Sequence, residues 1–402
     1  MPGPLHGVRV VDLTNVVSGP LATMILADQG ADVIKVEHPS GGDFTRAVSN
    51  RRGGFSANFL NNNRNKRSIA IDLKTADGLT LIKELIAGAD VLAQNFRPGV
   101  VERMGLGEDA VRAIKPDIIY VSISGFGDAG PFASRPVYDP LVQAISGLTT
   151  IQAGSDETRP RLVRTIIPDK ITGYTAAQAI TAALFARERT GEGQHVKLSM
   201  LDSVIAFLWH SDMGSQTFVG DEFPQETAQS FIDLIYETTD GYISVSVMTD
   251  KQWQALTRAL GTPEWLDDPR FKTAELRQIN LDDRLTLTQE VLRTRHSADW
   301  LERLEAEDVP CAPVLRRRDM VDHPQVQANE IVVEFAHPEA GPLRQARPAA
   351  RFSRTPFEYR GGGPSLGGHT DDILGELGYE ADRINSLRAA GVIGEPRRWQ
   401  ND

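Results

Sequence analysis

Short apolar segments alternate with helical segments over the first 124 residues, and this alternation constrains the fold more than any other feature. Four segments are short, apolar and mostly β-branched, as buried strands are: residues 8–13, 32–37, 90–94 and 117–124. Between them, residues 21–29 and 79–87 are predicted helices, each followed by a glycine. Strands that alternate with helices form parallel sheets. We therefore predict an α/β fold with an open, mostly parallel sheet.

The turn after the first strand decides whether this sheet could bind a dinucleotide. A dinucleotide fold needs the glycines of a G-x-G-x-x-G pattern there, so that the backbone can approach the pyrophosphate. Residues 14–20 read TNVVSGP and contain one glycine, Gly19. The same turn offers Ser18 as a helix N-cap and Pro20 at a helix start. The predicted large domain is thus Rossmann-like but lacks the dinucleotide fingerprint.

A smaller α/β unit is predicted as an insertion in the large domain. The clearest helix of the chain covers residues 171–187, and a strand over 195–200 follows it. The pattern then changes to one strand and several helices: residues 242–248, 251–260, 281–294 and 299–306. A last helix is predicted near residues 371–377. We predict a discontinuous large domain, residues 1–221 and 326–402, and a small domain, residues 222–325.

Composition argues against several classes of protein. The one cysteine, Cys311, excludes an intrachain disulfide and a cysteine-based metal cluster. The net charge of −11 argues against a nucleic-acid partner, although a local basic pocket could hold an anionic cofactor. No segment approaches the run of about 20 apolar residues that spans a membrane, and residues 1–7 do not resemble a secretory signal. We expect a metal-free cytoplasmic enzyme with no membrane or nucleic-acid partner.

Several stretches, in their order and spacing, resemble the class III CoA-transferase family. They are GADVIKVEHP (30–39), NKRSI (65–69) with DLK (72–74), NFRPG (95–99) with RMG (103–105), SGFG (124–127), YD (138–139), TGEGQ (190–194) and VPCAP (309–313). The family includes formyl-CoA transferase and carnitine CoA-transferase, and α-methylacyl-CoA racemase shares its fold. The resemblance implies a two-domain subunit shaped as an open ring, and a homodimer in which two rings interlock.

The resemblance implies that Asp169 is the catalytic nucleophile of a CoA-transferase. CoA would pass from an acyl-CoA donor to a carboxylic acid acceptor through aspartyl anhydride and aspartyl-CoA thioester intermediates. An ionised carboxylate needs no metal, general base or tightly bound cofactor for this chemistry. Taken by itself, Asp169 precedes the predicted helix 171–187, where Asp is a favoured N-cap whose loss costs about 1 kcal/mol. The two interpretations are compatible, since a helix N-terminus stabilises an ionised carboxylate.

The resemblance also implies a set of CoA contacts. Lys74, Arg97 and Arg103 would hold phosphate as charge-assisted donors, although each taken alone is an ordinary solvated charge. His38 departs from the pattern, because formyl-CoA transferase has an arginine at this position and a largely neutral imidazole binds phosphate less well. The implied set is Val17, Ser18, His38, Ile71, Asp72, Leu73, Lys74, Asn95, Phe96, Arg97, Arg103, Val137, Tyr138 and Asp139.

Two alternatives to CoA transfer remain open: an acyl-CoA racemase or epimerase, and a non-catalytic CoA-binding protein. The racemase branch has a histidine where this chain has Tyr138, and a tyrosine hydroxyl is a poor base at neutral pH. A protein that only binds CoA would not need Asp169. The glycine run that covers the active site of formyl-CoA transferase is missing between residues 225 and 270, and residues 361–363 lie too late to replace it. The sequence does not identify the donor and acceptor acids.

Overall fold

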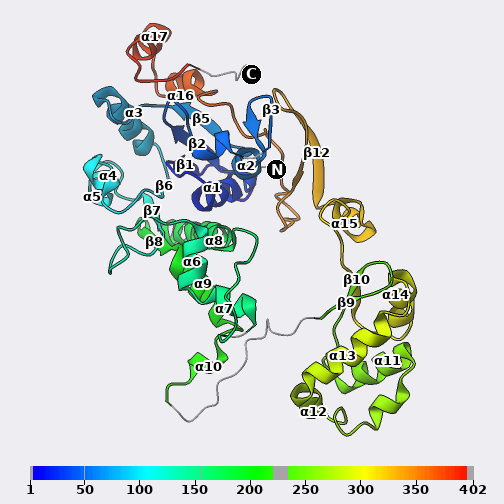
Figure 1. The fold of residues 1–402 in the computed structure, drawn as a ribbon. Helices are drawn as coiled ribbons and strands as arrows, with labels where there is room; N and C mark the ends of the chain where they lie inside the picture. Colours follow the sequence, from blue (N-terminus) through cyan, green and yellow to red (C-terminus); the bar gives the residue numbers. More distant parts are fainter. Residues whose placement is uncertain (1–2, 49, 155, 221–233, 396–402) are drawn as a thin grey trace. The chain divides into compact units, whose positions relative to one another are not determined.

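The computed structural model describes residues 3–48, 50–154, 156–220 and 234–395 (Figure 1). Contacts group the chain into two compact units, Met1–Gln229 with Glu330–Asp402, and Ser230–Asn329. The large unit is thus discontinuous in sequence, and the small unit is one continuous stretch. Within the described ranges, no helix is long and apolar enough to cross a membrane.

The large unit is built around a sheet of six parallel strands. Their order across the sheet is β5-β2-β1-β6-β7-β8. In the middle of the sheet, Val11 lies between Ile34 and Leu92. The strands are β1 (Arg9–Asp12), β2 (Asp32–Glu37), β5 (Arg67–Ala70), β6 (Val91–Gln94), β7 (Ile119–Ser124) and β8 (His195–Ser199). The mostly parallel sheet predicted from the sequence is confirmed.

Helices cover both faces of this sheet. Those that dominate the packing are α1 (Ser18–Asp28) and α8 (Ile167–Thr190) on one face, and α3 (Ala76–Ala87) on the other. Neighbouring strand residues point to opposite faces, so Val10 joins the core under α1 and α8 whereas Val11 joins the core under α3. Burial on both faces explains why the strands are apolar throughout rather than alternating with polar residues.

Three helices begin at least three residues earlier than the sequence pattern predicts, and one of them is α3, which starts at Ala76 instead of residue 79. Helix α1 starts at Ser18 instead of residue 21, with Val17 as its N-cap. Helix α8 starts at Ile167 instead of residue 171, with Ile166 as its N-cap, because Pro168 has a backbone angle suited to the first turn. Neither N-cap side chain accepts a capping hydrogen bond. The predictions that Ser18 and Asp169 act as N-caps are therefore wrong, since both residues lie inside the first turn.

Shorter elements connect the strands of the large unit. A two-stranded hairpin precedes β5, and two short helices lie between β6 and β7. These connecting elements are η1 (Phe44–Ala47), β3 (Arg51–Arg52), β4 (Phe55–Ser56), α2 (Ala57–Asn63), α4 (Val100–Arg103), α5 (Glu108–Arg112), α6 (Asp139–Ile145), α7 (Leu148–Ala153), α9 (Met200–Trp209) and α10 (Gly214–Thr217).

The C-terminal stretch folds back onto the sheet beside β5 (Figure 1). Its backbone bonds to the segment around β5: Asn65 donates to the carbonyl of Gly361 at 3.0 Å, and His369 donates to that of Ser68 at 3.0 Å. The stretch contains an antiparallel hairpin and two helices, β12 (Val332–His337), β13 (Gly341–Ala346), α16 (Thr370–Glu376) and α17 (Ala381–Ala389). Of these elements, the sequence pattern predicted only α16.

The small unit has its own aromatic core. Three antiparallel strands lie in the order β11-β10-β9, and Trp253 contacts Trp265 and Phe271 at centroid distances of 6.1 and 5.6 Å. The predicted strand 242–248 ends earlier, at Val245. The elements are β9 (Ile235–Glu237), β10 (Tyr242–Val245), α11 (Asp250–Leu260), η3 (Pro263–Leu266), α12 (Ala274–Ile279), α13 (Leu281–Leu292), α14 (Ser297–Ala306), β11 (Cys311–Pro313), η4 (Met320–Asp322) and α15 (Pro324–Ala328).

Candidate active site

Asp169 lies in the first turn of α8, three residues after the N-cap Ile166. The backbone N–H and the hydroxyl of Ser18, the first residue of α1, lie near this carboxylate, where they act to lower its pKa. The beginnings of two helices that are far apart in the sequence therefore meet at this side chain. Asp169 is partly exposed.

A second carboxylate, that of Asp139, lies beside Asp169. Asp139 is the first residue of α6 and is buried. Its Oδ2 accepts a hydrogen bond from the backbone N–H of Asp169 at 3.4 Å, and its Oδ1 accepts one from Nε2 of Gln143 at 2.6 Å. Gln143 also accepts a hydrogen bond from the backbone N–H of Val163 at 2.9 Å. This amide thus ties the loop before α8 to α6 and supports the pair of carboxylates.

The pKa of Asp169 reflects these surroundings. Burial, and then the negative charge of Asp139, raise the pKa of Asp169 to about 6, against the opposing effect of the N–H and the hydroxyl of Ser18. Burial also raises the pKa of Asp139. With a pKa near 6, about nine-tenths of Asp169 is ionised at pH 7. The side chain is therefore a mostly ionised carboxylate at neutral pH, and it is more basic than an ordinary surface aspartate.

A glycine brings α8 close enough to α1 for this contact. Gly173 lies one turn after Asp169, on the same face of α8. A Cβ at Gly173 would lie 2.9 Å from the carbonyl oxygen of Ser18 and 2.9 Å from Cδ2 of Leu21. Any larger residue would have to push the two helices apart. Gly173 thus helps to set the distance between Ser18 and Asp169.

Buried charges fix the turn between β1 and α1. Asp12, at the end of β1, accepts a hydrogen bond from the backbone N–H of Thr14 at 2.9 Å and pairs with Nζ of Lys66 at 3.1 Å. Lys35 donates to the carbonyl of Thr14 at 2.7 Å and pairs with Asp43 at 2.9 Å. The side chains of both lysines are fully buried. The turn is therefore held by charged groups from two strands of the sheet.

The same turn contains a valine in a left-handed backbone conformation. Val16 has a φ of 73°, which for a β-branched residue costs on the order of 1–3 kcal/mol. The preceding residue, Asn15, is clamped by Asn95, whose Nδ2 donates to the Asn15 carbonyl at 2.8 Å and whose Oδ1 accepts from its N–H at 2.9 Å. Tertiary contacts thus hold a strained turn directly before Ser18, an arrangement common at functional sites.

Most of the predicted CoA contacts gather at one edge of the sheet. Residues 17–18, 38, 71–74 and 95–97 follow the carboxyl ends of β1, β2, β5 and β6, which run parallel. Ligands bind at this edge in open α/β sheets. Residues 137–139 lie after β7 at the start of α6, and Arg103 ends α4. The exposed members of the set are His38, Lys74, Arg97, Arg103 and Tyr138.

In other members of the predicted set, the side chain packs in the core or bonds the backbone. Val17 and Ile71 are buried, and Leu73 and Phe96 pack against the core under α3. Both polar ends of the Asn95 side chain bond the turn before α1. These side chains shape the edge of the sheet, and a ligand would meet the exposed residues around them.

His38 and Asp72 face each other. Nε2 of His38 lies 3.6 Å from Oδ1 of Asp72, and Nδ1 accepts a hydrogen bond from the backbone N–H of Ser40 at 3.2 Å. Nε2 of His38 is thus the ring nitrogen that faces the carboxylate. A phosphate beside His38 would also approach the negative charge of Asp72, which makes this position a weaker phosphate site than an arginine would provide.

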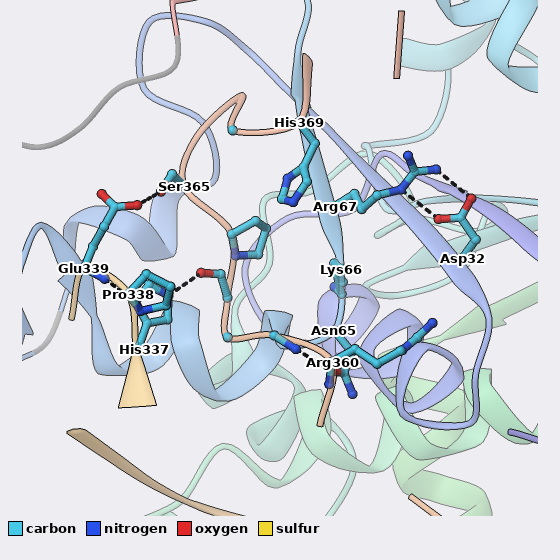
Figure 2. Close-up of a pocket in the computed structure, with 15 residues that line it drawn as sticks. Asp32, Asn65, Lys66, Arg67, His337, Pro338, Glu339, Arg360, Ser365 and His369 are labelled. Carbon is cyan, nitrogen blue, oxygen red and sulfur yellow. Dashed lines mark hydrogen bonds and ion pairs between the residues drawn. The ribbon is translucent and has the colours of Figure 1, made fainter. Parts of the chain in front are cut away.

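A cavity of about 480 Å³ lies at the opposite edge of the sheet, where β2 and β5 begin (Figure 2). Arg67 and Asp32 in its wall pair with each other at 2.7 Å, and Nε2 of His337 bonds the Gly363 carbonyl at 3.0 Å. None of the predicted site residues lines this cavity. Among the residues that the structure describes, no three His, Cys, Asp or Glu side chains gather as metal ligands would. The candidate active site is therefore the cluster around Asp169.

Comparison with known proteins identifies the family. The chain matches the model of CoA-transferase family III over residues 5–370. It is 36% identical over 400 residues to succinyl-CoA:glutarate CoA-transferase from Homo sapiens, with 98% of this chain and 90% of that protein covered. It is 35% identical over 410 residues to formyl-CoA:oxalate CoA-transferase from Streptomyces avermitilis, with 97% and 99% covered. The crystal structure of a CAIB/BAIF family protein from Brucella suis matches with a TM-score of 0.82 at 31% identity, over 94% of this chain and 100% of that chain. The chain therefore belongs to CoA-transferase family III and is a CoA-transferase.

Proposed function

We propose that this enzyme moves CoA between small carboxylic acids through covalent intermediates on Asp169. The observation that carries the proposal is the state of this side chain. Asp169 is partly exposed, has a pKa near 6, and donates its backbone N–H to the carboxylate of Asp139. A carboxylate that is ionised yet more basic than usual suits nucleophilic attack on a thioester. CoA would lie along the sheet edge, where Lys74, Arg97 and Arg103 are exposed cations for its phosphates.

The proposed reaction uses only carboxylate and thiolate groups. An oxygen of Asp169 bonds to the acyl carbonyl carbon, and the C–S bond breaks to give a mixed anhydride and CoA thiolate. The thiolate attacks Cγ of Asp169, and the donor acid leaves as its carboxylate. An acceptor carboxylate then attacks the aspartyl thioester, and the same two steps run in reverse. Each step exchanges one acyl bond for another, so the free energy of the thioester is retained.

The acids remain to be assigned, and the relatives suggest where to start. One relative is named for succinate and glutarate, the other for formate and oxalate. We propose that this chain also accepts short mono- or dicarboxylates. The test is to incubate the enzyme with succinyl-CoA or formyl-CoA and a panel of short acids in deuterated water, and to follow CoA esters by mass spectrometry.

A transferase produces a new CoA ester that depends on the added acid, with no deuterium at the α-carbon of the succinyl donor. Deuterium uptake without a new ester would instead indicate racemase chemistry. Recovery of every donor unchanged across the whole panel, with CoA ester bound, would favour a protein that only binds CoA. The last two results each contradict the proposed function.

We also propose that the chain forms an interlocked homodimer. Support comes from large apolar side chains exposed on α6, α8 and α9, three helices that contact one another: Leu141, Ile145, Tyr174, Phe185, Phe207 and Trp209. Apolar surface of this kind is typically covered by a protein partner. Linked chains cannot separate without unfolding, so we expect light scattering to give the mass of two chains at every dilution. A folded monomer that appears on dilution would contradict the interlocked arrangement.

A further inference from the structure

The residue that follows Asp169, Lys170, brings a positive charge to the candidate active site. Lys170 is the fourth residue of α8 and is exposed. Its Nζ donates a hydrogen bond at 2.7 Å to Oγ1 of Thr165, in the loop before the helix. Within the described ranges, no acidic side chain forms an ion pair with this ammonium group. The charge of Lys170 is therefore held by a neutral hydroxyl and is available to bind an anion.

Hydrogen bonds connect this lysine to the pair of carboxylates. The carbonyl of Thr165 accepts a hydrogen bond from Nε2 of Gln143 at 3.4 Å, and the same amide group bonds Oδ1 of Asp139 at 2.6 Å. Asp139 in turn bonds the backbone N–H of Asp169. Burial raises the pKa of Asp139, and the nearby charge of Lys170 is among the effects that oppose this rise. The ammonium group thus belongs to the same cluster as the two carboxylates.

The ammonium group lies at the site without pairing with Asp169. Side chains of consecutive residues on a helix do not face each other, and Nζ of Lys170 turns back to Thr165. A direct ion pair would favour the charged form of Asp169 and make it a weaker nucleophile. A substrate with two anionic ends can therefore place one end at Asp169 and the other at Lys170.

We propose that Lys170 determines acceptor specificity by binding the second carboxylate of a dicarboxylic acid. This inference rests on the proposed covalent role of Asp169. An oxygen of the first carboxylate bonds to Cγ of the aspartyl thioester, the C–S bond breaks, and CoA leaves as thiolate. Meanwhile the second carboxylate accepts a charge-assisted hydrogen bond from Nζ of Lys170. A monocarboxylic acid lacks this contact, so the enzyme should prefer dicarboxylic acids of the same chain length.

Competition between acids of equal chain length measures this preference. The enzyme and the CoA ester that it turns over fastest are mixed with equal concentrations of glutarate and pentanoate, and in a second mixture with malonate and propionate. Both acids of a mixture compete for the same form of the enzyme. The initial ratio of the two new CoA esters, measured by mass spectrometry, therefore equals the ratio of their kcat/KM values.

The test compares Lys170→Gln with the wild-type enzyme, with Lys170→Arg and with Lys83→Gln. We expect Lys170→Gln to lower the ratio of dicarboxylic to monocarboxylic ester about 10-fold, because it removes a hydrogen bond between charged groups. Lys170→Arg keeps the charge and should keep most of the preference. Lys83 is a matched control, since it is an exposed helix lysine on α3, which covers the other face of the sheet. Lys83→Gln should match the wild type.

The outcomes separate this inference from the proposed function. If Lys170→Gln keeps the wild-type ratio, even with lower yields of both esters or a higher KM for the CoA ester, the role of Lys170 in specificity is refuted and CoA transfer stands. A wild-type ratio that favours the monocarboxylic acid would overturn the inference as well. If the wild-type enzyme forms no new ester with any acid, the proposed function itself fails.

Discussion

Asp169→Asn is expected to reduce CoA transfer to near background while the fold remains intact. The amide has the shape of the carboxylate but is not an ionised nucleophile, so no anhydride can form. The wild-type enzyme should lose activity as the pH falls through about 6, where Asp169 takes up a proton. Activity assays across pH on both proteins, with mass spectrometry to confirm that the asparagine has not deamidated, measure the effect. A fully active asparagine variant would exclude Asp169 as the nucleophile.

The stability of the same variant tests the revised interpretation of Asp169. Because this residue lies inside the first turn and is not the N-cap, its replacement removes no cap. Burial and Asp139 raise its pKa above 3.8, so the folded state binds the proton more tightly than the unfolded state does. The ionised side chain therefore costs stability progressively as the pH rises from about 4 to about 6. We expect the asparagine variant to be no less stable than the wild type at pH 7 in urea unfolding.

Asp12→Asn is expected to destabilise the large unit by about 3–5 kcal/mol at pH 7, because it removes the negative charge that pairs with the buried Lys66. Burial raises the pKa of Asp12, but the charges of Lys66 and Lys35 outweigh it and lower the pKa below 3.8. A lowered carboxyl pKa contributes stability above pH 3.8 that is lost as the pH falls through the folded-state pKa. The stability lost through Asp12→Asn should therefore be largest at neutral pH and should become smaller in acid.

Urea unfolding at pH 7, together with a pH series, measures the effect of Asp12→Asn. The matched control is Asp128→Asn, which breaks an exposed pair with Lys197 at 2.9 Å and should hardly move the urea midpoint. Equal urea midpoints for the two variants would show that the buried charges do not stabilise the turn between β1 and α1. The turn carries Ser18, so the Asp12 variant should also lose activity under conditions where it is still folded.

The sheet could be predicted from the sequence because each of its strands is a short run of apolar residues that can be recognised without knowing the fold. The sequence pattern predicts a strand over residues 32–37, and β2 covers the same residues. The period of the apolar side chains and the glycines at helix ends are enough for such elements. The hairpin of β12 and β13 was not predicted, because it is held by side chains far away in sequence, as where Nε2 of Gln345 donates to the Leu60 carbonyl at 2.8 Å.

The helix starts could not be placed from local signals. Ser18 and Asp169 are both favoured N-cap residues, and the sequence alone gives each of them that role. In the structure the two residues lie near each other, because the two helices pack together where Gly173 removes the steric barrier. The position of Gly173, four residues after Asp169, was the available signal. The role of Gly173 depends on which helix packs against it, and the sequence alone does not identify that helix.

The supporting residues of the site were missed for the same reason. Gln143 lies four residues after Asp139, a spacing that suggests a side-chain contact on one helix. Its second contact, to the backbone of Val163, depends on how the loop before α8 returns. Lys66 appears within a stretch that resembles the family, yet its burial beside Asp12 follows only from the pairing of β5 with β2 and of β2 with β1.

Trapping the covalent intermediate tests the central claim most directly. Hydroxylamine is added while the wild-type enzyme turns over an acyl-CoA and an acceptor acid, and the protein is then digested and mapped by mass spectrometry. An activated aspartyl group reacts to a hydroxamate, so the account predicts one modified peptide, the one that contains Pro168, Asp169 and Lys170. The modification should require acyl-CoA and should be missing in Asp169→Asn. Rapid turnover with an unmodified Asp169 peptide, or with the adduct on another residue, would contradict covalent catalysis at this side chain.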